Sequence, residues 1–169
     1  MSDFDYTKAF LEGGEWAKHV ALLLNQAGVS CHAPAVQIAR NNAERRNMTL
    51  NEKDILLDDF DFCLEVKSTK GDHTTDIKEF PWRSLFVDTV SGYDAKIEKP
   101  FAYIIVSKVT GDPVCILTET YPKWSIKTTR DENQHITESF YSASASLLIS
   151  FDELVGILLD LKLEGRRTA

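Results

Sequence analysis

The chain lacks the patterns that mark several large protein classes. Its three cysteines, Cys31, Cys63 and Cys115, are odd in number and widely spaced, and they form no CxxC pair. This spacing argues against a disulfide framework and a zinc site, so reduced and partly buried thiols are expected. The sequence also has no P-loop, no dinucleotide-type glycine motif, no GxSxG motif and no internal repeat.

Long apolar runs are absent as well. No stretch approaches the roughly 18 residues of a membrane span, and the beginning of the chain, MSDFDYTKAF, lacks the basic flank and apolar core of a signal peptide. We therefore expect a soluble, intracellular (cytoplasmic) protein that does not enter a membrane. With 169 residues, of which 43% are hydrophobic, the sequence is expected to form one domain with a real core, residues 1–169.

The net charge of −7 lacks the basic footprint that nucleic-acid binding usually shows. The charge is uneven, however, because residues 67–130 carry ten Lys and Arg against eight Asp and Glu, whereas the segments on either side are acidic. A bound metal ion would also neutralise several of the N-terminal acids. The acidic total therefore does not exclude DNA as a partner.

The most informative segment is DILLDDFDFCLEVKS, which begins at Asp54. Two apolar runs around a polar turn predict a β-hairpin. A turn centred between Asp59 and Phe60 puts Asp54 opposite Glu65, with Cβ atoms about 5 Å apart. Residues two apart on one strand share a face, so Lys67 joins the two carboxylates.

This register pairs Leu56 with Cys63. It also keeps four apolar residues together on the opposite, buried face: Ile55, Leu57, Leu64 and Val66. A one-residue slip would turn apolar side chains of one strand outward, so the core is expected to enforce the pairing.

Two carboxylates this close repel each other unless a cation lies between them. Hard divalent ions such as Mg²⁺ favour one or two carboxylates plus waters and phosphate oxygens. Asp54 and Glu65 therefore indicate a metal site for phosphate chemistry, and an ordinary solvated strand face is the alternative. The acid-x-Lys pattern recurs at residues 76–78, 94–96 and 160–162, but only Glu65-Val66-Lys67 lies in an apolar strand with a second acid at the matching register.

An acid on one strand and Glu-x-Lys on the next resembles the core motif of the PD-(D/E)XK nuclease superfamily, the restriction-endonuclease-like fold. Eleven positions separate Asp54 from Glu65, which is within the habit of that family, although Lys53 stands where the family often has proline. The resemblance implies an α/β fold with a mixed central β-sheet flanked by helices. It also implies a Mg²⁺-dependent DNA nuclease, an endonuclease in our expectation, in which Mn²⁺ substitutes for Mg²⁺ and which could act as a homodimer.

The resemblance assigns roles to individual residues. Asp54, Glu65 and the backbone carbonyl of Val66 would bind the metal. Lys67 would position or help deprotonate the attacking water and stabilise the charge on the scissile phosphate. The first helix of this family commonly carries a catalytic Glu, and Glu15 resembles it.

The assignment of Glu15 depends on how the first helix begins. Residues 5–27 predict a helix that ends at a glycine, and the pair Gly13-Gly14 predicts a break after which the stronger helix starts at Glu15. Glu12 competes with Glu15 for the catalytic position, and a solvated helix glutamate is the alternative.

Candidate DNA contacts lie before and after the hairpin. Three arginines in the polar segment leading to it would suit phosphate binding, or would lie on a solvated helix face: Arg40, Arg45 and Arg46. Lys70 and His73 follow the hairpin in a long connection, residues 69–99, for which one short helix is expected near 82–90. His73 is expected to be a surface residue unless it assists proton transfer.

The second half of the chain predicts another hairpin, residues 101–119, whose apolar first strand is expected in the centre of the sheet. Beyond it, aromatic rings alternate with positive charge, which suits stacking on nucleic acid or covering a sheet edge: Tyr121, Trp124 and Lys127. Ser150 and Glu153 form a capping box before an amphipathic helix. Residues 164–169 are expected to be a disordered tail.

Two other hypotheses compete with the nuclease. The chain could be a non-catalytic nuclease-fold module that binds DNA or a protein partner, which would agree with its acidic charge, or some other small α/β domain. The intact set of Asp54, Glu65 and Lys67 favours the enzyme.

Overall fold

The computed structural model describes residues 6–35, 40–41, 43–44, 52–131 and 136–167. The helices are α1 (Tyr6–Gln26), α3 (Val90–Ala95) and α4 (Phe151–Arg167), with short 3₁₀ turns at Ile77–Glu79, Thr118–Lys123 and Ala145–Leu147. The strands are β1 (Cys31–His32), β2 (Ile55–Leu57), β3 (Cys63–Thr69), β4 (Ser84–Thr89), β5 (Ala102–Ser107), β6 (Pro113–Leu117), β7 (Ser125–Asp131), β8 (Ile136–Ser144) and β9 (Ile149–Ser150).

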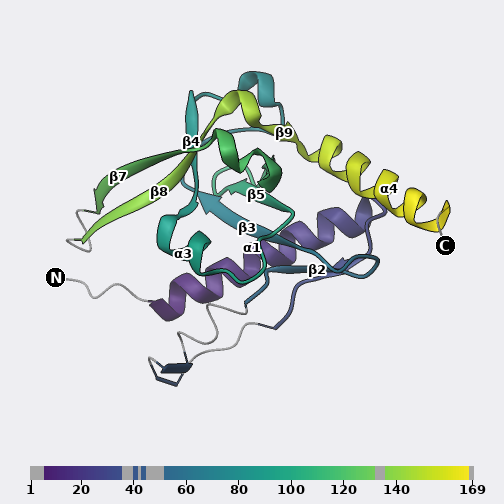
Figure 1. Cartoon of the computed structure of the whole chain (residues 1–169), viewed down its shortest axis with the longest axis horizontal. Coiled ribbons are helices and arrows are strands. Elements are labelled where there is room, and N and C mark those ends of the chain that lie inside the picture. Colours follow the sequence, from purple (N-terminus) through teal and green to yellow (C-terminus); the bar gives the residue numbers. More distant parts are fainter. Residues whose placement is uncertain (1–5, 36–39, 42, 45–51, 132–135, 168–169) are drawn as a thin grey trace.

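In the described part of the chain the strands form two sheets (Figure 1). The larger is six-stranded, in the order β1-β2-β3-β5-β6-β9, and the smaller is three-stranded, in the order β4-β8-β7. In the larger sheet β3 and β5 are parallel, and the other neighbours are antiparallel. The expected mixed sheet with helices is therefore confirmed.

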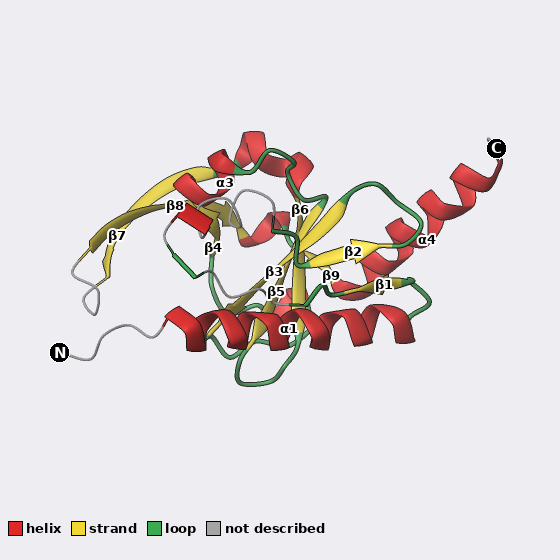
Figure 2. Ribbon diagram, turned by 90° about the horizontal axis from the view of Figure 1, so that it is seen from below, coloured by secondary structure: helices red, strands yellow, loops and turns green. Residues whose placement is uncertain are grey.

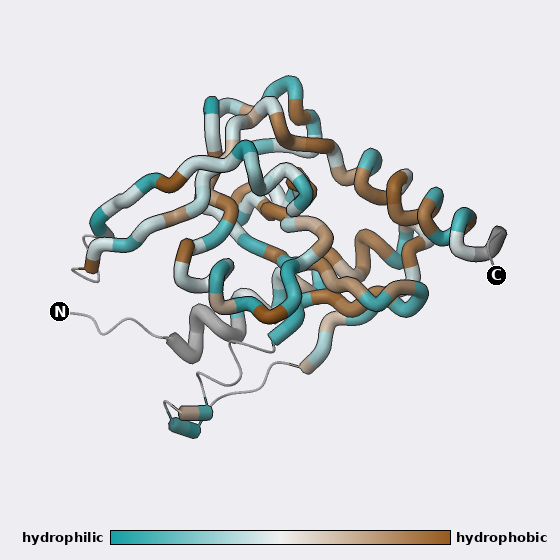
Figure 3. The backbone as a smooth tube through the Cα atoms, in the orientation of Figure 1, coloured by the Kyte–Doolittle hydropathy of each residue, from teal (hydrophilic) through white to brown (hydrophobic). Residues whose placement is uncertain are grey.

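The six-stranded sheet separates two hydrophobic cores. Every residue of β5 is buried, as expected of a central strand, and successive side chains point to opposite faces. Ala102, Ile104 and Val106 enter the core covered by α1 and α4, whereas Tyr103 and Ile105 enter the core covered by α3 and the three-stranded sheet. Figure 2 shows α1 on one side of the sheet and α3 on the other, and Figure 3 shows hydrophobic segments gathered in the central strands and in α4.

Helix α1 runs without a break through Gly13 and Gly14, so the predicted interruption is wrong. Glycine inside a helix costs about 1 kcal/mol relative to alanine. Burial of the α1 face that carries Ala17, Val20 and Leu24 offsets that cost. The predicted end of the helix is confirmed, because Gly28 adopts φ of 94° and Val29 N–H bonds the Leu24 carbonyl at 2.9 Å.

The helix expected near 82–90 is also wrong. This segment is β4, which pairs antiparallel with β8, and the short helix α3 follows it. Leu85 and Val87 alternate toward the second core, which is strand periodicity. The paired residues of β8 lie 51 to 60 positions later in the chain, so local sequence gives little sign of the pairing.

The C-terminal helix begins as predicted. Ser150 Oγ accepts from Glu153 N–H at 3.1 Å, and Ser150 N–H donates to Glu153 Oε2 at 3.1 Å. The expectation of a disordered tail from residue 164 is wrong up to Arg167, since α4 continues to that residue. An ion pair of 2.8 Å between Lys162 of α4 and Asp59 of the β2–β3 turn ties this helix to the sheet.

The cysteines are free and buried. Among the described residues, no helix has both the length and the apolar character that crossing a bilayer requires.

Candidate active site

The β2–β3 hairpin has the predicted register. Leu56 pairs with Cys63 and Ile55 with Leu64, so one step further along the ladder Asp54 lies opposite Glu65. The four apolar residues of the other face are all buried in the core covered by α1, as expected: Ile55, Leu57, Leu64 and Val66. The core therefore fixes the face on which the polar residues of this hairpin gather.

Asp54 directly precedes β2 and lies beside the part of β3 that follows its pairing with β2. Its Oδ2 accepts the backbone N–H of Val66 at 2.8 Å. The carbonyl of Cys63 accepts the N–H of Phe101, just before β5, at 2.8 Å. The carbonyl of Thr69 accepts the N–H of Lys108, just after β5, at 2.9 Å. Because backbone polar groups alternate sides along a strand, the N–H and carbonyl of Val66 point away from β5, toward Asp54. The Val66 carbonyl is thus directed to the side on which the Asp54 carboxylate lies.

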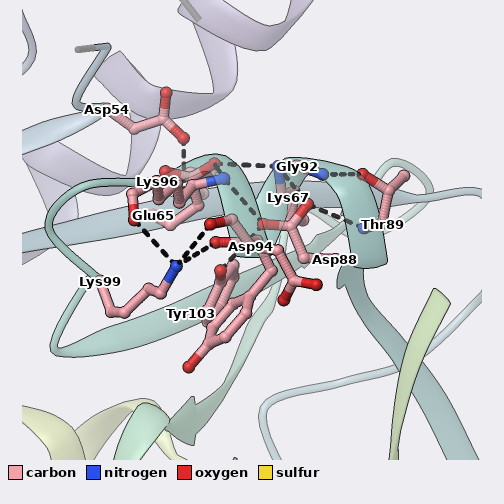
Figure 4. Close-up of polar contacts among 12 residues, drawn as sticks. Asp54, Glu65, Lys67, Asp88, Thr89, Gly92, Asp94, Lys96, Lys99 and Tyr103 are labelled. Atoms are coloured by element: carbon pink, nitrogen blue, oxygen red, sulfur yellow. Dashed lines mark hydrogen bonds and ion pairs between the residues drawn. The ribbon is translucent and has the colours of Figure 1, made fainter. Parts of the chain in front are cut away.

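Glu65 and Lys67 belong to a compact cluster of alternating charge (Figure 4). Lys67 Nζ lies 2.9 Å from Glu65 Oε1 and 3.4 Å from Asp88 Oδ1, and Lys96 Nζ lies 3.5 Å from Glu65 Oε1 and 2.8 Å from Asp88 Oδ2. Both carboxylates are only 7% exposed. We call Glu65, Lys67, Asp88 and Lys96 the charged cluster. In it, each lysine contacts both acids.

Asp88 is the most completely bonded member of the charged cluster. Besides the two lysines, it accepts the Tyr103 hydroxyl at 2.8 Å and the Thr89 N–H at 2.9 Å. Burial alone would raise the pKa of Asp88, but Lys67 and Lys96 outweigh burial and hold this pKa below its ordinary value.

The same balance keeps Lys67 charged. Burial by itself lowers the pKa of this ammonium, but the carboxylates of Glu65 and Asp88 more than compensate, and the pKa lies above its ordinary value. A lysine in this state is protonated throughout the neutral range. It can donate hydrogen bonds and stabilise negative charge, but it is a poor proton acceptor.

The pKa of Asp54, unlike the pKa values of Asp88 and Lys67, is shifted in the direction that disfavours the charged form. Burial, and then the negative charge of Glu65, raise the pKa of Asp54 from 3.8 to about 7, although the bond from Val66 N–H opposes this change. Glu52, at the start of the same described segment, also has a raised pKa, first because of burial and then because of Glu65. Burial and the charge of Glu65 thus make both acids difficult to ionise despite the nearby lysines, and a bound cation would favour their ionised forms.

The donors around Asp54 fit a magnesium ion in chemical type. Mg²⁺ takes oxygen ligands and often uses only one or two carboxylates, with waters and phosphate oxygens completing the octahedron. Asp54, Glu65 and the Val66 carbonyl provide such oxygens. Among the residues that the structure describes, no group of three or more His, Cys, Asp or Glu side chains is arranged to hold a metal, so this chain would supply a minimal ligand set.

The structure does not bring Glu15 into this site. Glu15 is 72% exposed and forms an ion pair of 3.1 Å with Lys18, on the outer face of the unbroken helix α1. Its competitor Glu12 pairs with Lys108 at 2.8 Å. Without the predicted break at the glycine pair, nothing turns Glu15 toward the hairpin.

The candidate DNA-binding residues are only partly described. Arg40 is exposed, and its backbone N–H donates to Glu44. Lys70 is exposed directly after β3. Arg45 and Arg46 lie outside the described residues.

Sequence reasoning missed Asp88 and Lys96. Both flank α3, and they reach the hairpin because β4 and α3 cover the face of β3 that carries Glu65 and Lys67. The short apolar run in SLFVD, between a serine and an acid, could have indicated a strand. Lys96 belongs to an acid-x-Lys pattern that lies outside an apolar strand, yet its side chain is only 14% exposed and contacts both acids of the charged cluster.

His73 is buried, with 2% exposure, so the expectation of a surface histidine is wrong. Its ring packs against Phe80 and Trp82, with ring centroids 5.6 and 6.4 Å away. It contributes to the packing of the connection between β3 and β4, where its imidazole fixes the position of two aromatic rings.

Comparison of the chain with protein-family models, with curated proteins and with solved structures finds no match.

Proposed function

We propose that this protein is a divalent-metal-dependent deoxyribonuclease of the PD-(D/E)XK type, with a restriction-endonuclease-like arrangement of the sheet around its site. The observation that carries the proposal is the position of Asp54. Its carboxylate accepts the backbone N–H of Val66 in β3, and the charge of Glu65, two positions before Lys67, adds to burial in raising its pKa. A carboxylate with a raised pKa beside a second carboxylate and a cation is typical of a functional site.

In this proposal Asp54, Glu65 and the Val66 carbonyl would hold the metal. A bound Mg²⁺ would supply Lewis acidity toward the phosphate and lower the pKa of a coordinated water. Lys67, which stays protonated, binds a non-bridging phosphate oxygen and stabilises the negative charge that develops there. One preorganised electrostatic group of this kind contributes about 3 to 4 kcal/mol to lowering a barrier.

Asp88 and Lys96 act through the other members of the charged cluster. Lys96 shares Glu65 with Lys67, so it keeps Glu65 partly neutralised when Lys67 turns to a phosphate. Asp88 holds both ammonium groups within 3.4 Å of its oxygens. We regard these two as positioning residues for Glu65 and Lys67.

The test is cleavage of plasmid and linear DNA by the purified protein with Mg²⁺, Mn²⁺, Ca²⁺ or EDTA. We expect cutting with Mg²⁺ and Mn²⁺, poor cutting with Ca²⁺, whose coordination is looser, and none with EDTA. Glu65→Gln is the matched inactive control. Equal cutting in EDTA would refute a metal mechanism, and light scattering on the same sample would test the expected homodimer.

One observation favours the non-catalytic alternative. Within the charged cluster, two lysines already balance two buried acids, as in a structural ion-pair network. If the network is only structural, calorimetric titration should detect no Mg²⁺ binding that Asp54→Asn removes. Binding of Mg²⁺ by the wild-type chain and its loss in that variant would favour the enzyme.

A further inference from the structure

A groove of about 490 Å³ opens beside the charged cluster. Lys67 and Asp88 line one end of it. Four aromatic rings and a second lysine line the rest, and we call this the aromatic groove: Phe80, Trp82, Phe86, Phe140 and Lys127, together with Lys67. The groove and the candidate active site are therefore continuous, since Lys67 belongs to both.

The alternation of side chains in the three-stranded sheet explains why aromatic rings face the groove. The three-stranded sheet uses one face, with Val87 and Tyr141, to cover the second core. Neighbouring positions therefore turn the other way, and Phe86 lies on Phe140 with ring centroids 4.7 Å apart. Phe86 remains 46% exposed and Trp82 42% exposed. Exposed aromatic rings concentrated in one groove are a common sign of a binding surface.

The wall opposite the sheet is held in place by the connection between β3 and β4. The hydroxyls of Ser107 and Thr110 bond the carbonyls of Gly71 and His73 at 2.7 and 2.6 Å. Gly71 lies so close to Trp82 that a Cβ at that position would be 2.3 Å from the tip of the indole. The observed position of Trp82 therefore requires a residue without a side chain at position 71.

The charge of the groove suits a nucleic-acid strand. Asp88 is compensated by its two lysines, and Lys127, opposite Phe140 in the β7–β8 pairing, reaches Ser84 Oγ at 2.8 Å. Glu138 lies on the same face nearer the tip of the hairpin, so the positive charge is at the base, beside the aromatic rings. Ammonium groups next to aromatic rings bind the phosphates and the bases of single strands.

We propose that the aromatic groove binds an unpaired nucleotide adjacent to the scissile phosphate, so that the substrate is DNA with a single-stranded segment. The position of this nucleotide next to a scissile phosphate rests on the proposed nuclease function. Binding of single-stranded DNA by the groove can be tested without cleavage. A base paired within a duplex has both π-faces covered by its neighbours, whereas an unpaired base can stack on Phe86 and Trp82. Lys67 would then contact the phosphate at the site while Lys127 contacts a neighbouring one.

The experiment measures the anisotropy of fluorescein-labelled oligo-dT and of a blunt DNA duplex, in EDTA, with the full chain. We expect tighter binding of the single strand and quenching of tryptophan fluorescence. Phe86→Ala should weaken single-strand binding about tenfold, the usual loss of a stacking platform. Lys127→Ala, which removes little packing, should weaken it and lower the salt slope by about one.

Ile126→Ala is the matched control, because Ile126 is 59% exposed next to Lys127 but pairs with Tyr141 on the other face. It should bind oligo-dT as the wild type does. Equal affinity for single strand and duplex, or unchanged binding by Phe86→Ala and Lys127→Ala, would overturn the inference. So would a dimer that Phe86→Ala dissociates, with no oligo-dT binding, since the groove would then hold a second copy.

The two proposals fail separately. Single-strand binding in EDTA that Phe86→Ala weakens, without cutting in Mg²⁺, would support the groove and refute the nuclease. Cutting of blunt duplex in Mg²⁺, without a single-strand preference in binding, would support the nuclease and refute the groove.

Discussion

Replacing Asp54 with asparagine changes the charge of the candidate site and leaves its shape almost intact. Asparagine has the volume of aspartate, and its side-chain oxygen can still accept the Val66 N–H bond, which is 2.8 Å long in the structure. What the substitution removes is a carboxylate that burial and Glu65 make difficult to ionise. The variant should therefore be more stable than the wild type wherever Asp54 is ionised and no metal is bound.

The direction follows from linkage between protonation and folding. The pKa of Asp54 is raised from 3.8 to about 7, so the folded chain binds this proton more tightly than the unfolded chain. The stabilisation from the bound proton is complete below about pH 4 and is lost as the pH rises through about 7. A pKa difference of about 3 corresponds to about 4 kcal/mol. Partial exposure to water reduces this, and we expect Asp54→Asn to gain about 2 kcal/mol at slightly alkaline pH.

The assay is urea unfolding of both proteins in EDTA, at acidic and at slightly alkaline pH. The gain should be present at alkaline pH and disappear near pH 4, where wild-type Asp54 is protonated. Added Mg²⁺ should then stabilise the wild type at alkaline pH but not the variant. Asp58→Asn is the control, because hydrogen bonds from Ser30 and His32 lower the pKa of Asp58, and its loss should bring no gain. Equal stability of Asp54→Asn and wild type in alkaline EDTA would refute the electrostatic argument.

Four other substitutions, with Lys78→Ala as a control, test the rest of the site. Lys67→Ala should abolish DNA cleavage, while its affinity for Mg²⁺ in calorimetry should stay within a few-fold of the wild-type value. Lys78 is exposed, so Lys78→Ala should cut DNA normally. Equal losses of cleavage in both variants would contradict a special role for the Glu65-Val66-Lys67 motif. Lys96→Ala should reduce cleavage at least tenfold, because this ammonium contacts both acids of the charged cluster, and wild-type rates would show that it is dispensable. Tyr103→Phe should lower the free energy of unfolding in urea by about 2 kcal/mol, since its hydroxyl bonds a buried carboxylate; no change would contradict that. Asp59→Asn should keep most of the cleavage activity, because its carboxylate pairs with α4 at the hairpin turn, and an inactive variant would place the metal elsewhere.

The hairpin could be predicted because all of its determinants are local. Asp54 and Glu65 are brought together by a short turn, and the apolar residues of the opposite face allow only one register. The same holds for the capping box at Ser150 and for the end of α1 at Gly28. In each case a few neighbouring residues decide the structure, and their chemistry is visible in the sequence.

The other half of the charged cluster could not be predicted in this way. Asp88 is at the end of a strand whose partner, β8, begins at Ile136. Local propensity around 82–90 is compatible with either helix or strand, and the distant partner decides in favour of strand. The case of Glu15 is the converse. The glycine pair is a local signal that predicted a break before Glu15, but packing of α1 on the sheet keeps the helix continuous.

The charged cluster therefore joins two layers of the protein that sequence patterns do not connect. Glu65 and Lys67 come from a hairpin fixed by the core under α1, and Asp88 and Lys96 come from β4 and the end of α3, which the second core holds. Lys67 has access to both layers: it contacts Glu65 on its own strand, Asp88 on the other layer, and the aromatic groove between them. A ligand that extends to the charged end of the groove would meet the ammonium group of Lys67, whose charge the surrounding acids maintain. The chemistry of Asp54 and Glu65 and the recognition of a strand by the groove would then depend on one side chain.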